Sequence, residues 1–100
     1  MEAEVYRVKG ELTLQIQDHG PRTKVEKEAE AYFLKAIEVA RWQQAKSLEL
    51  RATTSLARLW RQQGKKGEAH QLLAAIYDWF TEGFDTRDLQ EAKALLDVLA

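Results

Sequence analysis

Apolar residues recur at helical spacing along most of the chain, and few residues interrupt this pattern. The glycines and the single proline are Gly10, Gly20, Pro21, Gly64, Gly67 and Gly83. Between Thr23 and Gln63 neither residue type occurs, yet one helix of about 40 residues would be about 60 Å long, which is unusual in a small domain. A turn is therefore expected near residues 44–46. The pattern predicts an all-α domain with five helices, over about residues 2–17, 24–43, 47–63, 66–81 and 86–99.

Polar residues mark two of the expected helix starts. Ser47 is the expected N-cap of the third helix, and Asp85 or Thr86 is the expected N-cap of the fifth. Asp88 would then lie near the positive end of the fifth helix dipole. The segment LTLQI, residues 12–16, alternates as a strand does. A lone short strand would have no pairing partner, so the sequence favours a helix there.

The second and fourth helices carry similar inward faces, which indicates an internal repeat. An offset of 40 residues superposes Phe33 on Leu73 and Ala36 on Ile76. The two faces consist of Ala29, Phe33, Ala36 and Ala40 in one helix and Ala69, Leu73, Ile76 and Phe80 in the other. We expect a single domain over residues 1–100: a hairpin at about 2–43, a second at about 47–81 and a capping helix at about 86–99.

The spacing of these residues resembles that of the tetratricopeptide-like repeats. Six residues of the second hairpin stand at the family's positions, and these are Leu56, Ala57, Trp60, Gly64, Ala69 and Leu73. The first hairpin fits at Tyr6, Gly10, Ala29, Phe33 and Ala36, but a loop at residues 18–25 lengthens the link between its helices. The period of 40 residues also exceeds the usual 34. The resemblance implies a close crossing of two helices where Ala57 meets Ala69.

Two longer runs resemble the C-terminal tails of large bacterial signalling proteins. These runs are KSLELRATTSLARLWRQQGK, residues 46–65, and YDWFTEGFDTRDLQEAKALL, residues 77–96. Such proteins carry an adenylate-cyclase or winged-helix output domain, a predicted ATPase and then helical repeats. Neither upstream domain is present in this sequence, so the resemblance carries over no cyclase or ATPase activity. It implies a repeat module that serves as a sensor or a docking surface in a signalling or transcriptional regulator.

Composition and charge narrow the possible partners. The 100 residues include 15 lysines and arginines against 16 acidic residues, which gives a net charge of −1. This balance does not supply the broad positive field that binding to a nucleic-acid backbone needs. Cysteine is absent, which excludes disulfides and thiolate chemistry. The apolar run LLAAIY, residues 72–77, is too short to span a bilayer, and the N-terminal stretch is too charged for a secretion signal. We expect a cytoplasmic protein that binds neither nucleic acid nor membrane.

No motif for catalysis, metal or cofactor binding emerges. His19 and His70 lack other ligands at metal-binding spacing. The segment GKKG, residues 64–67, follows no strand and lacks the Ser or Thr of a phosphate loop, so a helix-hairpin turn accounts for it better. Glu26, Glu28 and Glu30 point around different faces of a helix, which does not support acid–base chemistry. Four large aromatic residues, Trp60, Trp79, Phe80 and Phe84, could form a ligand pocket, but the sequence favours a core role for them.

The third helix carries a polar face beside its inward stripe. Thr53, Leu56, Ala57 and Trp60 form the inward stripe. The neighbouring polar face consists of Arg51, Thr54, Ser55, Arg58, Arg61 and Gln62. The resemblance to tetratricopeptide-like repeats places this face in a concave groove, where guanidinium groups would suit the carboxylates of an acidic peptide. The alternative is a solvated face with glutamate partners nearby.

Three functional hypotheses follow. The first is a non-catalytic module that binds a protein or an acidic peptide in this groove. The second is a regulatory domain that senses a small anionic molecule, and the third is a helical enzyme domain whose site goes unrecognised.

The first helix has two apolar stripes on nearly opposite sides. Tyr6, Gly10 and Leu14 are expected to face the partner helix of the hairpin. The second stripe consists of Val5, Val8, Leu12 and Ile16. The fifth helix, with Leu89, Ala92, Leu96 and Leu99, can cap the other end of the domain, so the second stripe stays open. We expect a homodimer or the upstream repeats of a longer chain to cover it.

Overall fold

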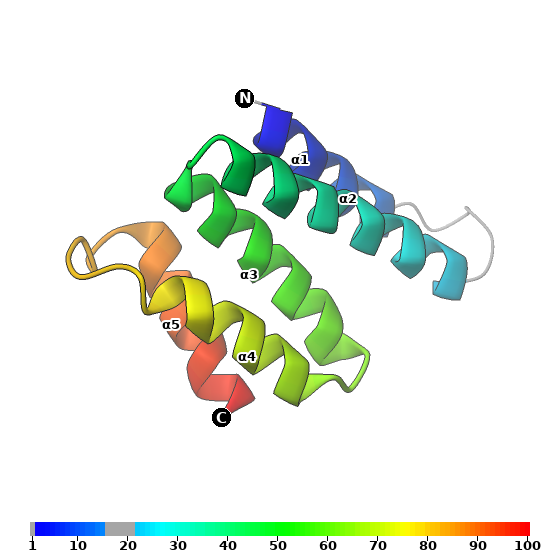
Figure 1. The fold of residues 1–100 in the computed structure, drawn as a ribbon. Coiled ribbons are helices and arrows are strands. Elements are labelled where there is room, and N and C mark those ends of the chain that lie inside the picture. The colour runs from blue at the N-terminus through cyan, green and yellow to red at the C-terminus, as the bar shows by residue number, and fades with distance from the viewer. Residues whose placement is uncertain (1, 16–21) are drawn as a thin grey trace.

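The computed structural model describes residues 2–15 and 22–100, and within these residues the chain forms five helices and no strand. The helices are α1 (Glu2–Gln15), α2 (Arg22–Trp42), α3 (Lys46–Gln62), α4 (Lys66–Tyr77) and α5 (Arg87–Leu99) (Figure 1). The predicted all-α class is confirmed. Residues 12–15 belong to α1, so the strand-like alternation does not form a strand there, and Ile16 lies outside the described residues.

The turn between α2 and α3 lies where the sequence predicts it. Gln44 adopts a left-handed backbone conformation with a φ of 56°, and the Ala45 N–H donates to the carbonyl of Ala40 over 2.8 Å. These contacts end α2 without a glycine. The prediction that Ser47 caps α3 is wrong. Ala45 occupies the N-cap position without a side-chain hydrogen bond, because the chain re-enters helical geometry at Lys46, two residues after the left-handed Gln44.

Helix α4 is shorter than predicted, ending at Tyr77 instead of about residue 81. The N–H groups of Trp79 and Phe80 donate to carbonyls three residues earlier, over 3.2 and 3.1 Å, and these tighter turns end the α-helix. Phe80 is therefore not a helical inward residue, although its half-buried ring packs against the core. Thr86 occupies the N-cap of α5 with extended backbone angles, but its side chain makes no capping hydrogen bond.

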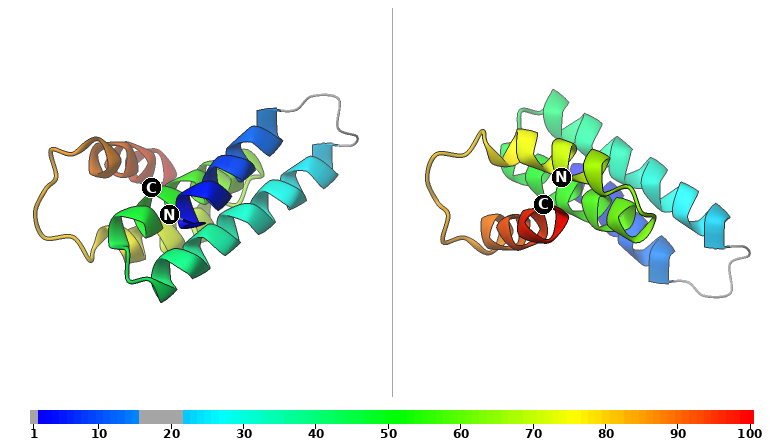
Figure 2. Two further views of the ribbon diagram at one scale, coloured as in Figure 1. Left: turned by 90° about the horizontal axis from the view of Figure 1, so that it is seen from above. Right: turned by 90° about the horizontal axis from the view of Figure 1, so that it is seen from below.

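The helices lie in two layers. Helices α1 and α2 pack as one antiparallel hairpin and α3 and α4 as a second, with α3 also packed against α2. Helix α3 contacts both α1 and α5, so these three helices form one layer, while α2 and α4 lie on the other side (Figure 2). The faces of α1, α3 and α5 that point away from α2 and α4 therefore form one continuous surface.

Two hydrophobic clusters stabilise this arrangement, and α3 contributes to both. The first cluster joins α2 to α3 and consists of Ala29, Phe33, Ala36, Ile37, Ala52, Leu56 and Leu59. The second joins α3, α4 and α5 and consists of Leu50, Ala57, Ala69, Leu73, Ile76, Leu89, Ala92, Leu95 and Leu99. The half-buried ring of Trp60 packs against both clusters. Ala57 and Ala69 are both fully buried in the second cluster, as the predicted crossing of α3 and α4 requires.

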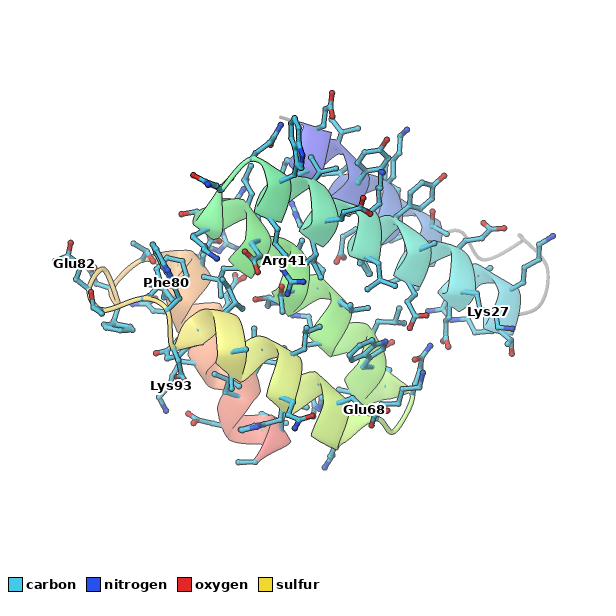
Figure 3. The ribbon with its side chains drawn as sticks, in the orientation of Figure 1. Lys27, Arg41, Glu68, Phe80, Glu82 and Lys93 are labelled. Atoms are coloured by element: carbon cyan, nitrogen blue, oxygen red, sulfur yellow. The ribbon has the colours of Figure 1, made fainter. Side chains whose placement is uncertain are left out.

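Helix α1 joins the first cluster through the face that the sequence assigns to it. Gly10 is buried against the ring of Phe33, and Tyr6 and Leu14 pack against the same cluster. On the opposite stripe, Val5, Val8 and Leu12 are exposed. At the other end of the hairpin, Arg41 extends from α2 toward α3 and its Nε donates to the buried carboxylate of Glu49 over 2.9 Å (Figure 3). This ion pair ties the two hairpins together beside the α2–α3 turn.

Candidate binding groove

A concave pocket of about 310 Å³ lies on the layer formed by α1, α3 and α5. It is lined by Arg7 from α1, by Arg51, Thr54, Ser55 and Arg58 from α3, and by Arg87, Asp88 and Glu91 from α5. The pocket exists because α3 is flanked by α1 on one side and α5 on the other, so that the polar face of α3 forms its floor.

Four of the six predicted groove residues line this pocket. Arg51 and Arg58 contribute guanidinium groups, whereas Thr54 and Ser55 are only 4% and 2% exposed and form the buried floor. The Thr54 hydroxyl donates to the carbonyl of Leu50 over 2.8 Å, so its hydrogen bond stays within the helix. Thr54 and Ser55 therefore shape the floor of the pocket, and the arginines are the groups that a ligand would contact.

The other two predicted residues lie elsewhere. Arg61 is exposed and lines an adjoining depression of about 250 Å³, which it shares with Arg58, Glu91, Ala94, Leu95 and Val98. Gln62 is the exposed last residue of α3 and lines neither the pocket nor this depression. The predicted face was therefore too long at its C-terminal end, because α1 and α5 enclose the N-terminal and middle part of α3.

Half of the pocket comes from residues that the sequence reasoning missed. Arg7, Arg87, Asp88 and Glu91 belong to α1 and α5 and reach the polar face of α3 only through the tertiary packing. One local signal was available: Arg87 and Glu91 stand at the i, i+4 spacing of a helical ion pair. That spacing predicts a pair on α5 but does not predict that the pair faces α3.

Arg51 lies at the centre of the pocket and links all three helices of the layer. Its Nη1 is 3.0 Å from Glu4 Oε2 on α1, and its Nη2 is 2.9 Å from Asp88 Oδ2 on α5. Arg7 also holds Glu4 through two hydrogen bonds, from Nε over 2.9 Å and from Nη2 over 2.8 Å. Glu4 thus accepts from two guanidinium groups.

A second set of ion pairs closes the C-terminal side of the pocket. Glu91 accepts from Arg87 Nε over 2.9 Å and from Arg58 Nη2 over 3.3 Å. Four arginines, Arg7, Arg51, Arg58 and Arg87, therefore face three carboxylates, those of Glu4, Asp88 and Glu91, which leaves one net positive charge. The arginines do have acidic partners, as the alternative interpretation of this face expected.

The ion pairs shift the pKa values of Glu4, Glu91 and Arg51. The hydrogen bond from Arg7, with a further one from Arg51, lowers the pKa of Glu4 below its ordinary value of 4.5. Hydrogen bonds from Arg87 and then from Arg58 lower the pKa of Glu91 in the same way. The pKa of Arg51 is raised by Asp88 and then by Glu4. These shifts keep Glu4, Glu91 and Arg51 charged at neutral pH.

These shifts predict a loss of stability in acid. A carboxylate with a lower pKa in the folded chain stabilises the fold above its ordinary value of 4.5, and this contribution is lost as the pH falls through the folded pKa. The pairs are partly exposed, so we expect them to contribute at most about 1 kcal/mol.

Thermal unfolding at a series of pH values measures this effect. Wild type should lose up to about 4–8 °C more between about pH 5 and pH 3 than the Glu4→Gln, Glu91→Gln double variant. Glu82→Gln, at an exposed residue of the α4–α5 link, is the control and should follow wild type. Parallel pH profiles for wild type and the double variant would contradict the assignment.

The histidines and the large aromatic residues were the other candidates for a binding or catalytic site. Within the described residues, no group of three or more histidine, aspartate and glutamate side chains is placed to hold a metal ion; His70 is half-buried on α4, and His19 lies outside those residues. Trp60 packs on the core, and its Nε1 donates to Glu30 Oε1 over 2.6 Å. The expected core role is wrong for Trp79 and Phe84, which are 58% and 44% exposed and lie in the link between α4 and α5.

Comparison with known proteins identifies no match for this chain. No protein-family model matches the sequence, and no characterised protein or solved structure matches the chain. No helix within the described residues is both long and apolar enough to cross a membrane. The fold and the pocket therefore define the class: a small array of antiparallel helices with an arginine-rich concave surface.

Proposed function

We propose that this domain is a non-catalytic protein-interaction module of the tetratricopeptide-like kind, which binds an acidic segment of a partner protein in the groove of α1, α3 and α5. One observation carries the proposal: arginines from three separate helices converge on one hollow and outnumber the carboxylates that pair with them. Guanidinium groups are the donors that best match a carboxylate in geometry and charge.

The arrangement of the helices supports this assignment. In a tetratricopeptide-like array the first helix of each hairpin lines the concave face, and α1 and α3 are the first helices of the two hairpins. Helix α5 packs against α3 as the first helix of a further hairpin would. The runs at residues 46–65 and 77–96 resemble the repeat tails of bacterial signalling regulators. We propose the same setting for this module, a repeat tail of a cytoplasmic signalling or transcriptional regulator.

An acidic ligand would bind by exchange with the internal ion pairs. The side chains of Arg51 and Arg58 are 39% and 47% exposed, so a carboxylate from solution can reach them. Their internal pairs are worth little at such exposure, and a ligand carboxylate replaces them at small cost. The resulting affinity is modest and falls with increasing salt.

The test measures binding of a fluorescein-labelled peptide of alternating aspartate and glutamate by fluorescence anisotropy. The Arg51→Ala, Arg58→Ala double variant should bind at least about tenfold more weakly at low salt, and the difference should shrink at high salt. The control is Lys24→Ala with Lys27→Ala, which removes the same charge from exposed positions of α2 outside the groove. Circular dichroism checks that each variant is folded. Equal losses in both double variants would show a general charge effect and would overturn the groove assignment.

A second candidate is a regulatory domain that senses a small anionic molecule. The polar pocket, at about 310 Å³, falls within the size range of small-molecule sites. A thermal-shift comparison of citrate, inorganic phosphate and nucleotides with the acidic peptide separates the two. Stabilisation by a small anion at concentrations where the peptide has no effect would favour the sensor.

A further inference from the structure

The outer side of α1 carries an exposed apolar stripe that no other described part of the chain covers. Val5, Val8 and Leu12 are 51%, 40% and 53% exposed. They lie almost opposite Gly10, which faces α2, so they point away from the body of the domain and from the groove. An apolar stripe of this kind marks an interface.

The surface around the stripe is shaped to receive side chains. One shallow depression of about 300 Å³ is lined by Glu4, Val5, Val8 and Lys9, and another of about 420 Å³ by Glu2, Val5, Tyr6 and Lys9. Val5 and Lys9 line both depressions, so Val5 borders each of them. Ridges and hollows in alternation are what two helices need to interlock.

The spacing of the stripe is that of a short coiled coil. Val5, Val8 and Leu12 follow at intervals of three and four residues, as the a, d and a positions of a heptad do. Glu4 and Lys9 flank the stripe on opposite sides, at the g and e positions. We propose that two copies of this chain associate through this stripe, with their α1 helices side by side and parallel.

Charge complementarity favours a second copy of the chain as the partner and a parallel orientation of the two α1 helices. In a parallel pair, Glu4 of each copy lies opposite Lys9 of the other, which gives two equivalent ion pairs. An antiparallel pair would instead bring Glu4 near Glu11 of the second copy. Glu4 already accepts three hydrogen bonds from Arg7 and Arg51, and a carboxylate offers about four acceptor positions, so one remains for Lys9. The stripe is thus complementary to itself, as a twofold interface requires.

The size of the stripe makes the association weak. Helix α1 has 14 residues and a length of about 21 Å, which is too short to bury the roughly 800 Å² per partner of a standard interface. Trp42 of α2, which is 86% exposed, lines a further depression of about 340 Å³ together with Glu2 of α1, and this depression extends the face onto α2. We expect a dissociation constant on the order of 10–100 µM.

Sedimentation equilibrium on the full chain, up to about 500 µM, tests the association. Wild type should shift from monomer to dimer with concentration, and Val8→Glu with Leu12→Glu should stay monomeric while remaining folded by circular dichroism. The matched control is Leu34→Glu with Val98→Glu, which places two glutamates at apolar positions of similar exposure on α2 and α5. The control should dimerise as wild type does. A monomeric wild type throughout, or a control that dissociates equally, would overturn the proposal.

Single cysteines test the parallel direction, because the natural chain has none. Under mild oxidation, Val5→Cys and Leu12→Cys should each form a disulfide-linked dimer, since a parallel pair places each position beside its own copy. Leu34→Cys is the control and should stay largely monomeric. In an antiparallel pair with residue 5 opposite residue 12, each of these residues lies about 10 Å along the axis from its own copy, and only a mixture of the two variants would cross-link efficiently. That result would overturn the parallel arrangement.

Discussion

Replacing Phe33 with alanine should lower the free energy of unfolding by about 3–5 kcal/mol, the largest stability effect that we expect from one substitution in this chain. The Phe33 side chain is 0% exposed and is the largest member of the cluster that joins α2 to α3. Its ring also forms the surface on which Gly10 of α1 packs. Truncation therefore leaves a cavity where three helices meet, and small domains of this size are stable by only about 5–15 kcal/mol.

Urea denaturation followed by circular dichroism measures this loss. The neighbouring residue provides the control, because Leu34 is 46% exposed and belongs to neither cluster. Leu34→Ala should change the stability by less than about 0.5 kcal/mol. If Phe33→Ala cost no more than Leu34→Ala, α1 and α3 would not meet α2 at this ring.

Two glycine-to-alanine substitutions should have opposite signs, although both glycines lie in helices. Alanine at Gly67 in α4 should raise the stability by about 0.5–1 kcal/mol, because the new Cβ meets nothing within 4 Å and alanine favours helix. A Cβ at Gly10 would lie 2.5 Å from Cε1 and 2.7 Å from Cδ1 of Phe33. That ring is fully buried and cannot swing into solvent, so overpacking of about 1–3 kcal/mol exceeds the gain in helix propensity.

The comparison of the two variants isolates the contact between α1 and α2. Both add one methyl group to a helical glycine, so the gain in helix propensity cancels, and the difference in their free energies of unfolding, about 1–3 kcal/mol, reports on the packing. The same denaturation measurements provide it. Equal stabilisation in both variants would mean that the Gly10 face of α1 is not packed against α2.

The inward faces of the helices were predictable because they depend on local periodicity. Ala29, Phe33, Ala36 and Ala40 recur at helical spacing, and all four are completely buried. Helix ends were less predictable. Two i, i+3 hydrogen bonds, from the N–H groups of Trp79 and Phe80, end α4 four residues before the predicted end. The left-handed Gln44 starts the turn before α3, and Ala45 takes the N-cap position that the sequence predicts for Ser47. Hydrogen bonds of this kind depend on how the next helix is positioned.

The candidate groove was predictable only in part, for a related reason. Arg51 and Arg58 share one face of α3, and the period of the helix suffices to place them together. Arg7 and Arg87 are far from them in sequence, and no periodicity connects residues on three helices. The same is true of Glu4 and Asp88, whose pairing with Arg51 spans 47 and 37 residues.

The amino-acid sequence alone thus determines where helices form, which stripes are buried and where small residues stand at helix crossings. These features are local, because a helix repeats every 3.6 residues and each face needs one kind of side chain. Three other features depend on the packing of whole helices. These are the convergence of α1 and α5 on the polar face of α3, the ion pairs of its arginines, and the exposure of Trp79 and Phe84. Such packing is set by contacts between residues distant in sequence, which is why the pocket and its charge balance emerged only with the assembled fold.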